Sequence, residues 1–293
     1  MEFITIQNET LTVVLKRTGA VLHSIQKDGL EYLWQNTHPD GWKRRDANLF
    51  PCVGRLNQGK YRYEGREYPM TPHGFCQDAV FTVTEQSPTF VCFTLNENPD
   101  PRCQYPFTFS FHVTYEVEGN RIIKTCRVEN RDSKMMYFGM GSHPAFQVPL
   151  AGEGEFTDWY FEFPKASTPN RITLDYSNWL LAENRPLYPL ADGSKVPLTH
   201  NLFDHDAIIL QNMPRCITLR SQKSRHSVTV EFPGMPFVGL WHNDHKEVPF
   251  VCVEPWLSLP AHSAYMEDLE TQENLVHLPA GETYENSITI TLE

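Results

Sequence analysis

The chain has 293 residues, of which 40 % are hydrophobic and 21 % are charged, as in ordinary globular proteins. Its formal net charge of −11 argues against binding to nucleic acid or anionic membranes, because both are held by basic surfaces. No apolar run approaches the roughly 18–20 residues of a membrane-spanning helix, and residues 1–16 lack the basic region that begins a signal peptide.

In chain order, the predicted elements are short strands in which apolar residues recur with a period of two. The turn signals Glu64-Gly65 and Glu118-Gly119-Asn120 predict two hairpins, one joining residues 61–63 to 66–68 and one joining 109–117 to 121–128. The other predicted strands are 10–13, 20–25, 31–34, 160–163, 207–210, 216–219, 226–230, 248–256 and 287–292.

No stretch of a dozen residues shows a helical stripe, and the 22 prolines and 16 glycines are spread along the chain rather than gathered in a linker. Many short strands with closely spaced turns are typical of an antiparallel sandwich or barrel. We therefore predict a single all-β domain over residues 1–293.

Seven cysteines are present, an odd number without a CxxC pair and with several members inside apolar runs. This pattern indicates reduced, buried thiols in a cytoplasmic protein rather than disulfides, and it shows no zinc-ligand spacing. The cysteines are Cys52, Cys76, Cys92, Cys103, Cys126, Cys216 and Cys252.

Residues 248–256 form the most apolar of the predicted strands, and Glu254 is their one charged residue. Such a run indicates a strand buried on both faces. An unpaired buried carboxylate costs several kcal/mol, so Glu254 needs hydrogen-bond donors or an opening to a cavity. Glu254 could lie at the end of the strand, where it reaches solvent or pairs with an arginine. Alternatively, it is a functional group.

Four polar islands interrupt the strands at residues 48–57, 72–75, 141–146 and 203–206. Loops on a rigid β scaffold commonly carry binding and catalytic groups. The islands contain Arg55, His73, His143, Asp204 and Asp206.

Each of these residues also has a structural interpretation. His73 lies at a Pro-Gly turn and could simply bond nearby backbone, whereas the small residues before His143 would let a ligand approach the chain closely. Arg55 follows a glycine in an apolar segment, which predicts a buried guanidinium that needs an acceptor. One of Asp204 and Asp206 could simply end a turn.

Other polar and aromatic groups are more ambiguous. Residues 242–245 contain two histidines and could suggest a metal pair, but a solvated loop is favoured, as is a solvated face for the basic run 43–45. Trp34, Trp241 and Trp256 are candidates for the core, although the last two flank the Glu254 strand and could stack on a sugar. No serine elbow, P-loop or dinucleotide fingerprint occurs.

Taken together, four motifs resemble the aldose 1-epimerase (mutarotase) family, most closely its LacX-type branch, in order and spacing over nearly the whole chain. They are Gly54-Arg55-Leu56-Asn57, Pro72-His73-Gly74-Phe75, Ser142-His143-Pro144-Ala145-Phe146 and Val253-Glu254-Pro255-Trp256.

The resemblance implies a large twisted antiparallel β-sandwich of the galactose mutarotase type, with a monosaccharide bound in an open cleft. It assigns Glu254 as the base that deprotonates the anomeric hydroxyl and His143 as the acid that protonates the ring oxygen. Arg55, His73 and an aspartate, for which Asp206 fits better than Asp204, would bind the sugar beside Trp241 and Trp256.

Mutarotation moves one proton from O1 and another to O5, so it needs a base and an acid on opposite sides of the substrate, and neither metal nor cofactor. Phe75 and Pro144 depart from well-studied galactose mutarotases, which predicts pocket walls that differ from a galactose enzyme. We expect a cytoplasmic isomerase of carbohydrate metabolism, either a monomer or a weak homodimer.

Three rival functions stay open. A hexose-6-phosphate mutarotase would need an extra cation, which residues 43–45 could supply. A non-catalytic sugar-binding protein would not need a matched acid and base. A glycoside hydrolase would need two carboxylates, and Glu254 with Asp206 could imitate that pair.

Overall fold

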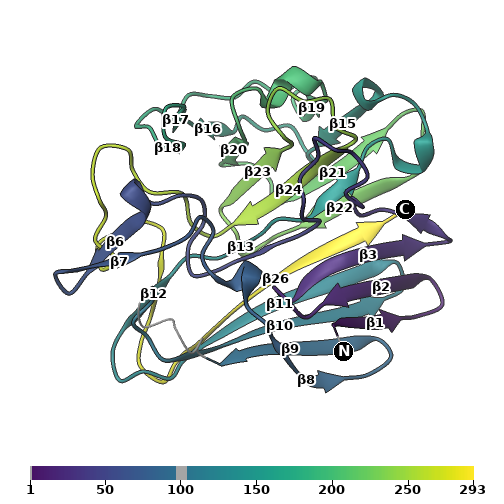
Figure 1. Ribbon diagram of the computed structural model, residues 1–293. Coiled ribbons are helices and arrows are strands. Elements are labelled where there is room, and N and C mark those ends of the chain that lie inside the picture. The colour runs from purple at the N-terminus through teal and green to yellow at the C-terminus, as the bar shows by residue number, and fades with distance from the viewer. Residues whose placement is uncertain (1, 97–103) are drawn as a thin grey trace.

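The regular secondary structure of the described residues consists of antiparallel strands and a few short 3₁₀ turns, in agreement with the all-β prediction (Figure 1). The structure is a computed structural model that describes residues 2–96 and 104–293, so Cys103 lies outside the described residues. Within those ranges, no helix has the length and apolar character that a bilayer crossing requires. The only helices there are single 3₁₀ turns: η1 (Asn57–Gly59), η2 (Cys76–Asp78), η4 (Leu150–Gly152), η5 (Phe156–Asp158) and η6 (His200–Phe203).

The largest sheet has nine strands and includes both long hairpin arms and the carboxyl-terminal strand, drawn in yellow in Figure 1. Its members are β8 (Thr82–Gln86), β9 (Phe90–Asn96), β10 (Phe109–Glu118), β11 (Arg121–Asn130), β15 (Trp159–Glu162), β19 (Lys195–Pro197), β21 (Cys216–Ser221), β22 (Ser227–Glu231) and β26 (Thr283–Leu292). Their order is β19-β15-β21-β22-β26-β11-β10-β9-β8. The hairpin predicted at residues 118–120 joins β10 to β11, as expected.

A second sheet, of seven strands, carries the predicted strand 248–256 near its middle. Its members are β5 (Asn48–Leu49), β13 (Gly141–Ser142), β14 (Ala145–Gln147), β16 (Asn170–Ile172), β20 (Ile208–Gln211), β23 (Phe237–Trp241) and β24 (Phe250–Trp256). The path runs β16-β20-β23-β24-β13-β5, and β14 also pairs with β24.

Four smaller sheets complete the described fold. A four-stranded sheet contains β1 (Phe3–Gln7), β2 (Leu11–Lys16), β3 (Val21–Lys27) and β4 (Leu30–Glu31). The pairs are β6 (Lys60–Tyr63) with β7 (Arg66–Pro69), β12 (Met136–Phe138) with β25 (Val276–Leu278), and β17 (Leu174–Asp175) with β18 (Leu180–Leu181). The hairpin predicted at Glu64-Gly65 is the β6–β7 pair. The strand predicted at 31–34 is shorter than expected, because Trp34 leaves β4 and donates its backbone N–H to Ala145.

The faces of β24 explain how this fold positions a site. All seven of its residues are buried, which confirms the predicted double-sided burial. Val251 and Val253 enter the main core with residues of the nine-stranded sheet, such as Ile290 of β26. Because side chains alternate along a strand, Phe250, Cys252, Glu254 and Trp256 share the opposite face. That face is covered by two smaller apolar clusters, and Glu254 is the charged residue between them.

Candidate functional site

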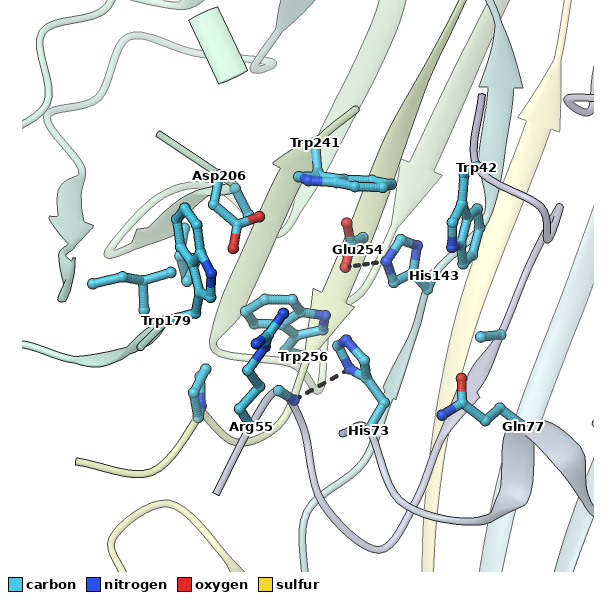
Figure 2. A pocket seen from close by; sticks show the side chains of 16 residues that line it. Trp42, Arg55, His73, Gln77, His143, Trp179, Asp206, Trp241, Glu254 and Trp256 are labelled. Atoms are coloured by element: carbon cyan, nitrogen blue, oxygen red, sulfur yellow. Dashed lines mark hydrogen bonds and ion pairs between the residues drawn. The ribbon is translucent and has the colours of Figure 1, made fainter. Parts of the chain in front are cut away.

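Glu254 borders a cavity of about 220 Å³ on the outer face of the seven-stranded sheet (Figure 2). Residues from all four polar islands meet there, although the islands are spread over residues 48–206 of the sequence. Those that line the cavity are Arg55, His73, His143, Asp206 and Glu254, together with Trp42, Trp179, Trp241 and Trp256.

The strand register brings His143 opposite Glu254. On one side Gly141 of β13 pairs with Trp256, and on the other Ala145 of β14 pairs with Cys252. His143 lies midway between those two pairings, and its position therefore faces Glu254 on the same side of the sheet. Side chains directly opposite each other in antiparallel strands have Cβ atoms about 4.5–5.5 Å apart. Contact between these two groups is thus a consequence of the fold.

His143 Nε2 lies 3.1 Å from Glu254 Oε2, and the two side chains are 9 % and 2 % exposed. Burial is the main cause that raises the pKa of Glu254 well above 4.5, and the negative charge of Asp206 adds to it. Burial also lowers the pKa of His143 well below 6.5, helped by His73. No arginine or histidine is among the main causes that set the pKa of Glu254, and only a hydrogen bond with Trp256 opposes the rise.

The two pKa shifts favour a pair that holds one proton between its members. Glutamate with a raised pKa and histidine with a lowered pKa both favour their neutral forms, and either way of placing one proton leaves the pair without net charge. A buried pair without net charge avoids the several kcal/mol that an uncompensated buried ion costs. This arrangement differs from the expected geometry, because acid and base touch each other on one wall and do not face each other across the substrate.

Trp42 fixes the ring of His143 from the side away from Glu254. The two rings stack with centroids 4.3 Å apart and an interplanar angle of 25°. Trp241 approaches the same imidazole edge-on at 5.7 Å, and His73 does so at 5.8 Å. Three aromatic rings therefore restrict the orientation of the imidazole while its Nε2 faces Glu254.

His73 is held as a neutral hydrogen-bond donor. The backbone N–H of Gly54 donates to its Nδ1 at 3.2 Å, so the proton of the neutral ring lies on Nε2 (Figure 2). Burial lowers the pKa of His73 to about 4, with help from the positive charges of Arg55 and Arg44. An Nε2–H donor beside the cavity is suited to an oxygen of a bound molecule.

The glycine after His73 is required by a close backbone approach. Gly74 has φ +76°, and a Cβ there would lie 2.0 Å from the carbonyl oxygen of Phe50. We expect Gly74→Ala to lower the free energy of unfolding by about 3 kcal/mol or more, because strain and overlap combine. Gly65→Ala is the matched control, since Gly65 has φ +72° with nothing within 4 Å of its Cβ. Denaturant unfolding compares the two, and equal losses would contradict the steric explanation.

Arg55 and Asp206 face the cavity from the side opposite His143 (Figure 2). Arg55 is exposed, so the predicted buried guanidinium was wrong: the apolar residues around it pack inward while its own side chain points into the cleft. Burial raises the pKa of Asp206, and hydrogen bonding by the Ala207 backbone and the charge of Arg55 oppose the shift.

The choice between the two aspartates is decided by their contacts. Asp206 lines the cavity. Asp204 instead accepts a hydrogen bond from the backbone N–H of His245 at 3.2 Å, and its Oδ1 lies 3.3 Å from His245 Nδ1. Of the two, Asp206 is therefore the group that a bound molecule would meet.

With this geometry established, comparison with known proteins gives the family. A family model described as aldose 1-epimerase matches residues 2–291. The chain belongs to the aldose 1-epimerase family. The plasmid and chromosomal LacX proteins of Lactococcus lactis subsp. lactis are each 32 % identical to it over 298 residues, which cover 99 % of this chain and of each relative. The resemblance to the LacX-type branch is thus confirmed.

Solved structures of similar proteins share the whole fold. A galactose mutarotase related enzyme from Lactobacillus acidophilus and a galactose mutarotase-like protein from Lactobacillus casei each match with a TM-score of 0.93 and 32 % identity. The matches cover 99 % of this chain and 97 % and 100 % of theirs. Galactose 1-epimerase from L. acidophilus, at 16 % identity and a TM-score of 0.74, has the same fold over 99 % of this chain and 94 % of its own.

Trp42, Trp179 and Gln77 line the cavity of this aldose 1-epimerase family member but were missed from the sequence. Trp42 and Trp179 lie in irregular segments without alternation, so nothing local marks them as pocket residues. Trp34, in contrast, is a core residue at 1 % exposure, and its indole N–H donates to the carbonyl of Trp42.

Two polar segments differ in part from their predictions. In the segment 242–245, Asp244 and His245 are exposed, as predicted for a solvated loop, but His242 is fully buried against Phe203, and burial lowers its pKa to about 4. The basic run 43–45 is not simply a solvated face either. Arg44 pairs with Asp78 at 2.7 Å, Arg45 donates to the carbonyl of His23 at 2.6 Å, and the run borders a second cavity of about 470 Å³.

The two departures from well-studied galactose mutarotases do not reach the cavity. Phe75 packs in the core, with its ring centroid 6.3 Å from that of Phe50. The carbonyl oxygen of Pro144 accepts a hydrogen bond from the backbone N–H of Val253 in β24. Neither residue lines the cavity, so the expectation that they alter its walls was wrong.

Proposed function

We propose that this protein is an aldose 1-epimerase that interconverts the α and β anomers of a free hexose by general acid and base catalysis. The observation that carries the proposal is the buried His143–Glu254 pair, 3.1 Å apart, at the wall of a small cavity with aromatic and polar sides. A cavity of about 220 Å³ is below the 300–1,000 Å³ typical of sites for drug-sized ligands, which favours one sugar ring over an oligosaccharide.

The chemistry balances within the pair. In the reactive form Glu254 is a carboxylate and His143 carries a proton on Nε2. Ring opening transfers the O1 proton to Glu254 while His143 donates its proton to O5, and the C1–O5 bond breaks as the C1–O1 carbonyl forms. After rotation about C1–C2, reclosure returns both protons along the same routes. The pair holds one proton before and after each step, so no exchange with solvent is needed.

Contact between acid and base suits this reaction. O1 and O5 are both bonded to C1, so two proton-transfer groups that touch each other can reach both oxygens from one side. Positioned acid and base groups each contribute about 10²–10⁴-fold to a rate. The short distance between His143 and Glu254 therefore supports the proposal as well as the expected opposed geometry would have done.

The remaining cavity groups provide sugar contacts in this proposal. His73 Nε2–H and the Arg55 guanidinium donate to hydroxyl oxygens, and Asp206 accepts from a hydroxyl group. The indole faces of Trp241 and Trp256 pack against the C–H groups of the ring. Such convergent polar groups on aromatic walls are the usual composition of small-ligand sites.

His73→Asn is expected to raise KM about 3–10-fold with a smaller change in kcat, because one hydrogen bond worth roughly 0.5–1.5 kcal/mol is lost. Asparagine tolerates the φ of +65° found at this position, so the backbone is preserved. His245→Asn is the control, since His245 has φ +52°, is exposed and lies outside the cavity. An unchanged KM for His73→Asn would contradict a role of His73 in binding the sugar.

The pH dependence of kcat/KM should reflect the titration of the His143–Glu254 pair and not that of a single histidine. Since burial holds the pKa of His143 well below 6.5, a second proton enters the pair only in acid. Since burial raises the pKa of Glu254 well above 4.5, the first proton leaves only at higher pH. We expect a plateau of kcat/KM bounded by a fall on each side. A single step rising through pH 6.5 in the rate of optical-rotation change would contradict a one-proton pair.

Exchange NMR of anomeric protons at equilibrium tests the proposal and identifies the sugar. The arms are glucose, galactose, other common aldoses and glucose 6-phosphate, each with and without protein. We expect exchange above the buffer rate for at least one free hexose. Exchange only with the 6-phosphate would favour the phosphorylated substrate, and tight binding without exchange would favour a sugar-binding protein.

The proposed activity also implies a metabolic role and a cellular location. Conversion of a sugar between its anomers is a step of carbohydrate metabolism, and we place it in the cytoplasm because all six described cysteines are free thiols. The family match over residues 2–291 supports one functional domain across the chain.

A further inference from the structure

The candidate active site also brings together three metal-ligating side chains. His143, Cys252 and Glu254 each present one ligand atom, and these atoms all lie within 4.8 Å of one another. All three side chains are buried. Within residues 2–96 and 104–293, this is the one group of three or more such side chains that could hold an ion.

The strand register explains the cluster. Cys252 and Glu254 are two positions apart on β24 and therefore point to the same face. His143 lies opposite Glu254 and diagonal to Cys252, whose direct partner is Ala145. Diagonal neighbours in antiparallel strands remain within reach of their side chains. The thiol therefore lies beside the acid–base pair, although the proposed epimerase chemistry does not use it.

We propose that this cluster is a binding site for a soft divalent cation of the zinc class, held by His143 Nε2, Cys252 Sγ and a carboxylate oxygen of Glu254. An imidazole nitrogen, a thiolate sulfur and a carboxylate oxygen are each ligand types that Zn²⁺ takes in proteins. The fourth coordination position opens to the cavity. Because the metal occupies the acid and the base, it inhibits the epimerase, a consequence that rests on the function proposed above.

The nitrogen and oxygen donors already have the separation that a tetrahedral ion requires, and the sulfur lies within 4.8 Å of the other two ligand atoms. Zinc binds nitrogen and oxygen at about 2.0–2.1 Å, which separates two such donors by about 3.3 Å. The observed Nε2–Oε2 distance is 3.1 Å. Hard cations such as Mg²⁺ prefer six oxygen ligands, so they do not fit this set.

The formal charges of the three ligands match a divalent cation. With Zn²⁺ bound, a thiolate, a carboxylate and a neutral imidazole offset the two positive charges, so the occupied site has no net charge. A buried site without net charge avoids the cost of an unpaired ion.

Isothermal titration of the reduced, full-length protein with ZnCl₂ tests the proposal. We expect one tight site for Zn²⁺ per chain, no heat from MgCl₂ at the same site, and a thiolate-to-metal charge-transfer band when Co²⁺ replaces Zn²⁺. Cys252→Ala should bind Zn²⁺ at least tenfold more weakly and lose the Co²⁺ band.

Two further variants make the result decisive. Cys252→Ser keeps the size of the side chain and should also lose the thiolate band, so a folding defect in the alanine variant does not prevent the test. Cys76→Ala removes another buried thiol and should bind Zn²⁺ as wild type does. Wild-type affinity in Cys252→Ala, or loss of binding in Cys76→Ala, would overturn the site. Because calorimetry needs no turnover, these outcomes stand even if the protein proves not to be an epimerase.

Discussion

Glu254→Gln is expected to reduce mutarotation by about 10²–10⁴-fold, since the amide cannot accept the O1 proton. The loss should appear in kcat, because the amide still fills the same space and still hydrogen-bonds a hydroxyl group. The measurement is the rate of optical-rotation change of a freshly dissolved α-anomer with the purified variant, after subtraction of the buffer rate.

The same substitution should leave the fold intact. Removing one partner of a buried ion pair usually costs 3–5 kcal/mol, because a charge is left unpaired. Here burial already lowers the pKa of His143 well below 6.5, so the histidine left behind is neutral at pH 7. We therefore expect a melting temperature close to that of wild type. A variant that keeps the full rate would contradict the assignment of Glu254, whereas an unfolded variant would contradict the neutral-pair description.

The second large effect concerns the pair as a unit. His143→Gln should also slow mutarotation by about 10²–10⁴-fold, because O5 no longer receives a proton. The double variant with Glu254→Gln should be little slower than either single variant, since either change already interrupts the proton cycle. Such strong non-additivity is typical of catalytic groups that act together.

A double-mutant cycle in kcat, measured by polarimetry at one pH, provides the coupling. Trp241→Phe is a useful control, because Trp241 lines the cavity but transfers no proton in the proposed mechanism. Its effect should add to that of Glu254→Gln. Full additivity between His143→Gln and Glu254→Gln would indicate two independent groups and would contradict the shared proton.

The period-two pattern predicted the architecture well, because strand alternation is a local property. It gave both hairpins and the burial of β24 on its two faces. Glu254 was identifiable as a functional candidate for the same reason, since a charge within such a strand conflicts with its surroundings. The polar islands and the family resemblance then supplied the other residues.

The contacts between distant segments could not be predicted in the same way. The contact of His143 with Glu254 depends on the register between β13, β14 and β24, which no local pattern specifies. The stacking of Trp42 on His143 comes from an irregular segment. The exposure of Arg55 was predicted wrongly, because apolar neighbours in sequence do not determine which way a loop side chain points. The burial of His242 was also missed, because the polar residues that follow it indicate a loop without showing that the first residue packs inward.

Optical rotation of the wild-type protein tests the central claim most directly. Freshly dissolved α-D-glucose and α-D-galactose are followed separately with catalytic amounts of protein and with buffer alone. The acid–base pair predicts that at least one of these sugars reaches its equilibrium rotation faster with protein, in proportion to the protein concentration. Rates equal to buffer for these and for the other common aldoses would contradict the claim that His143 and Glu254 catalyse mutarotation.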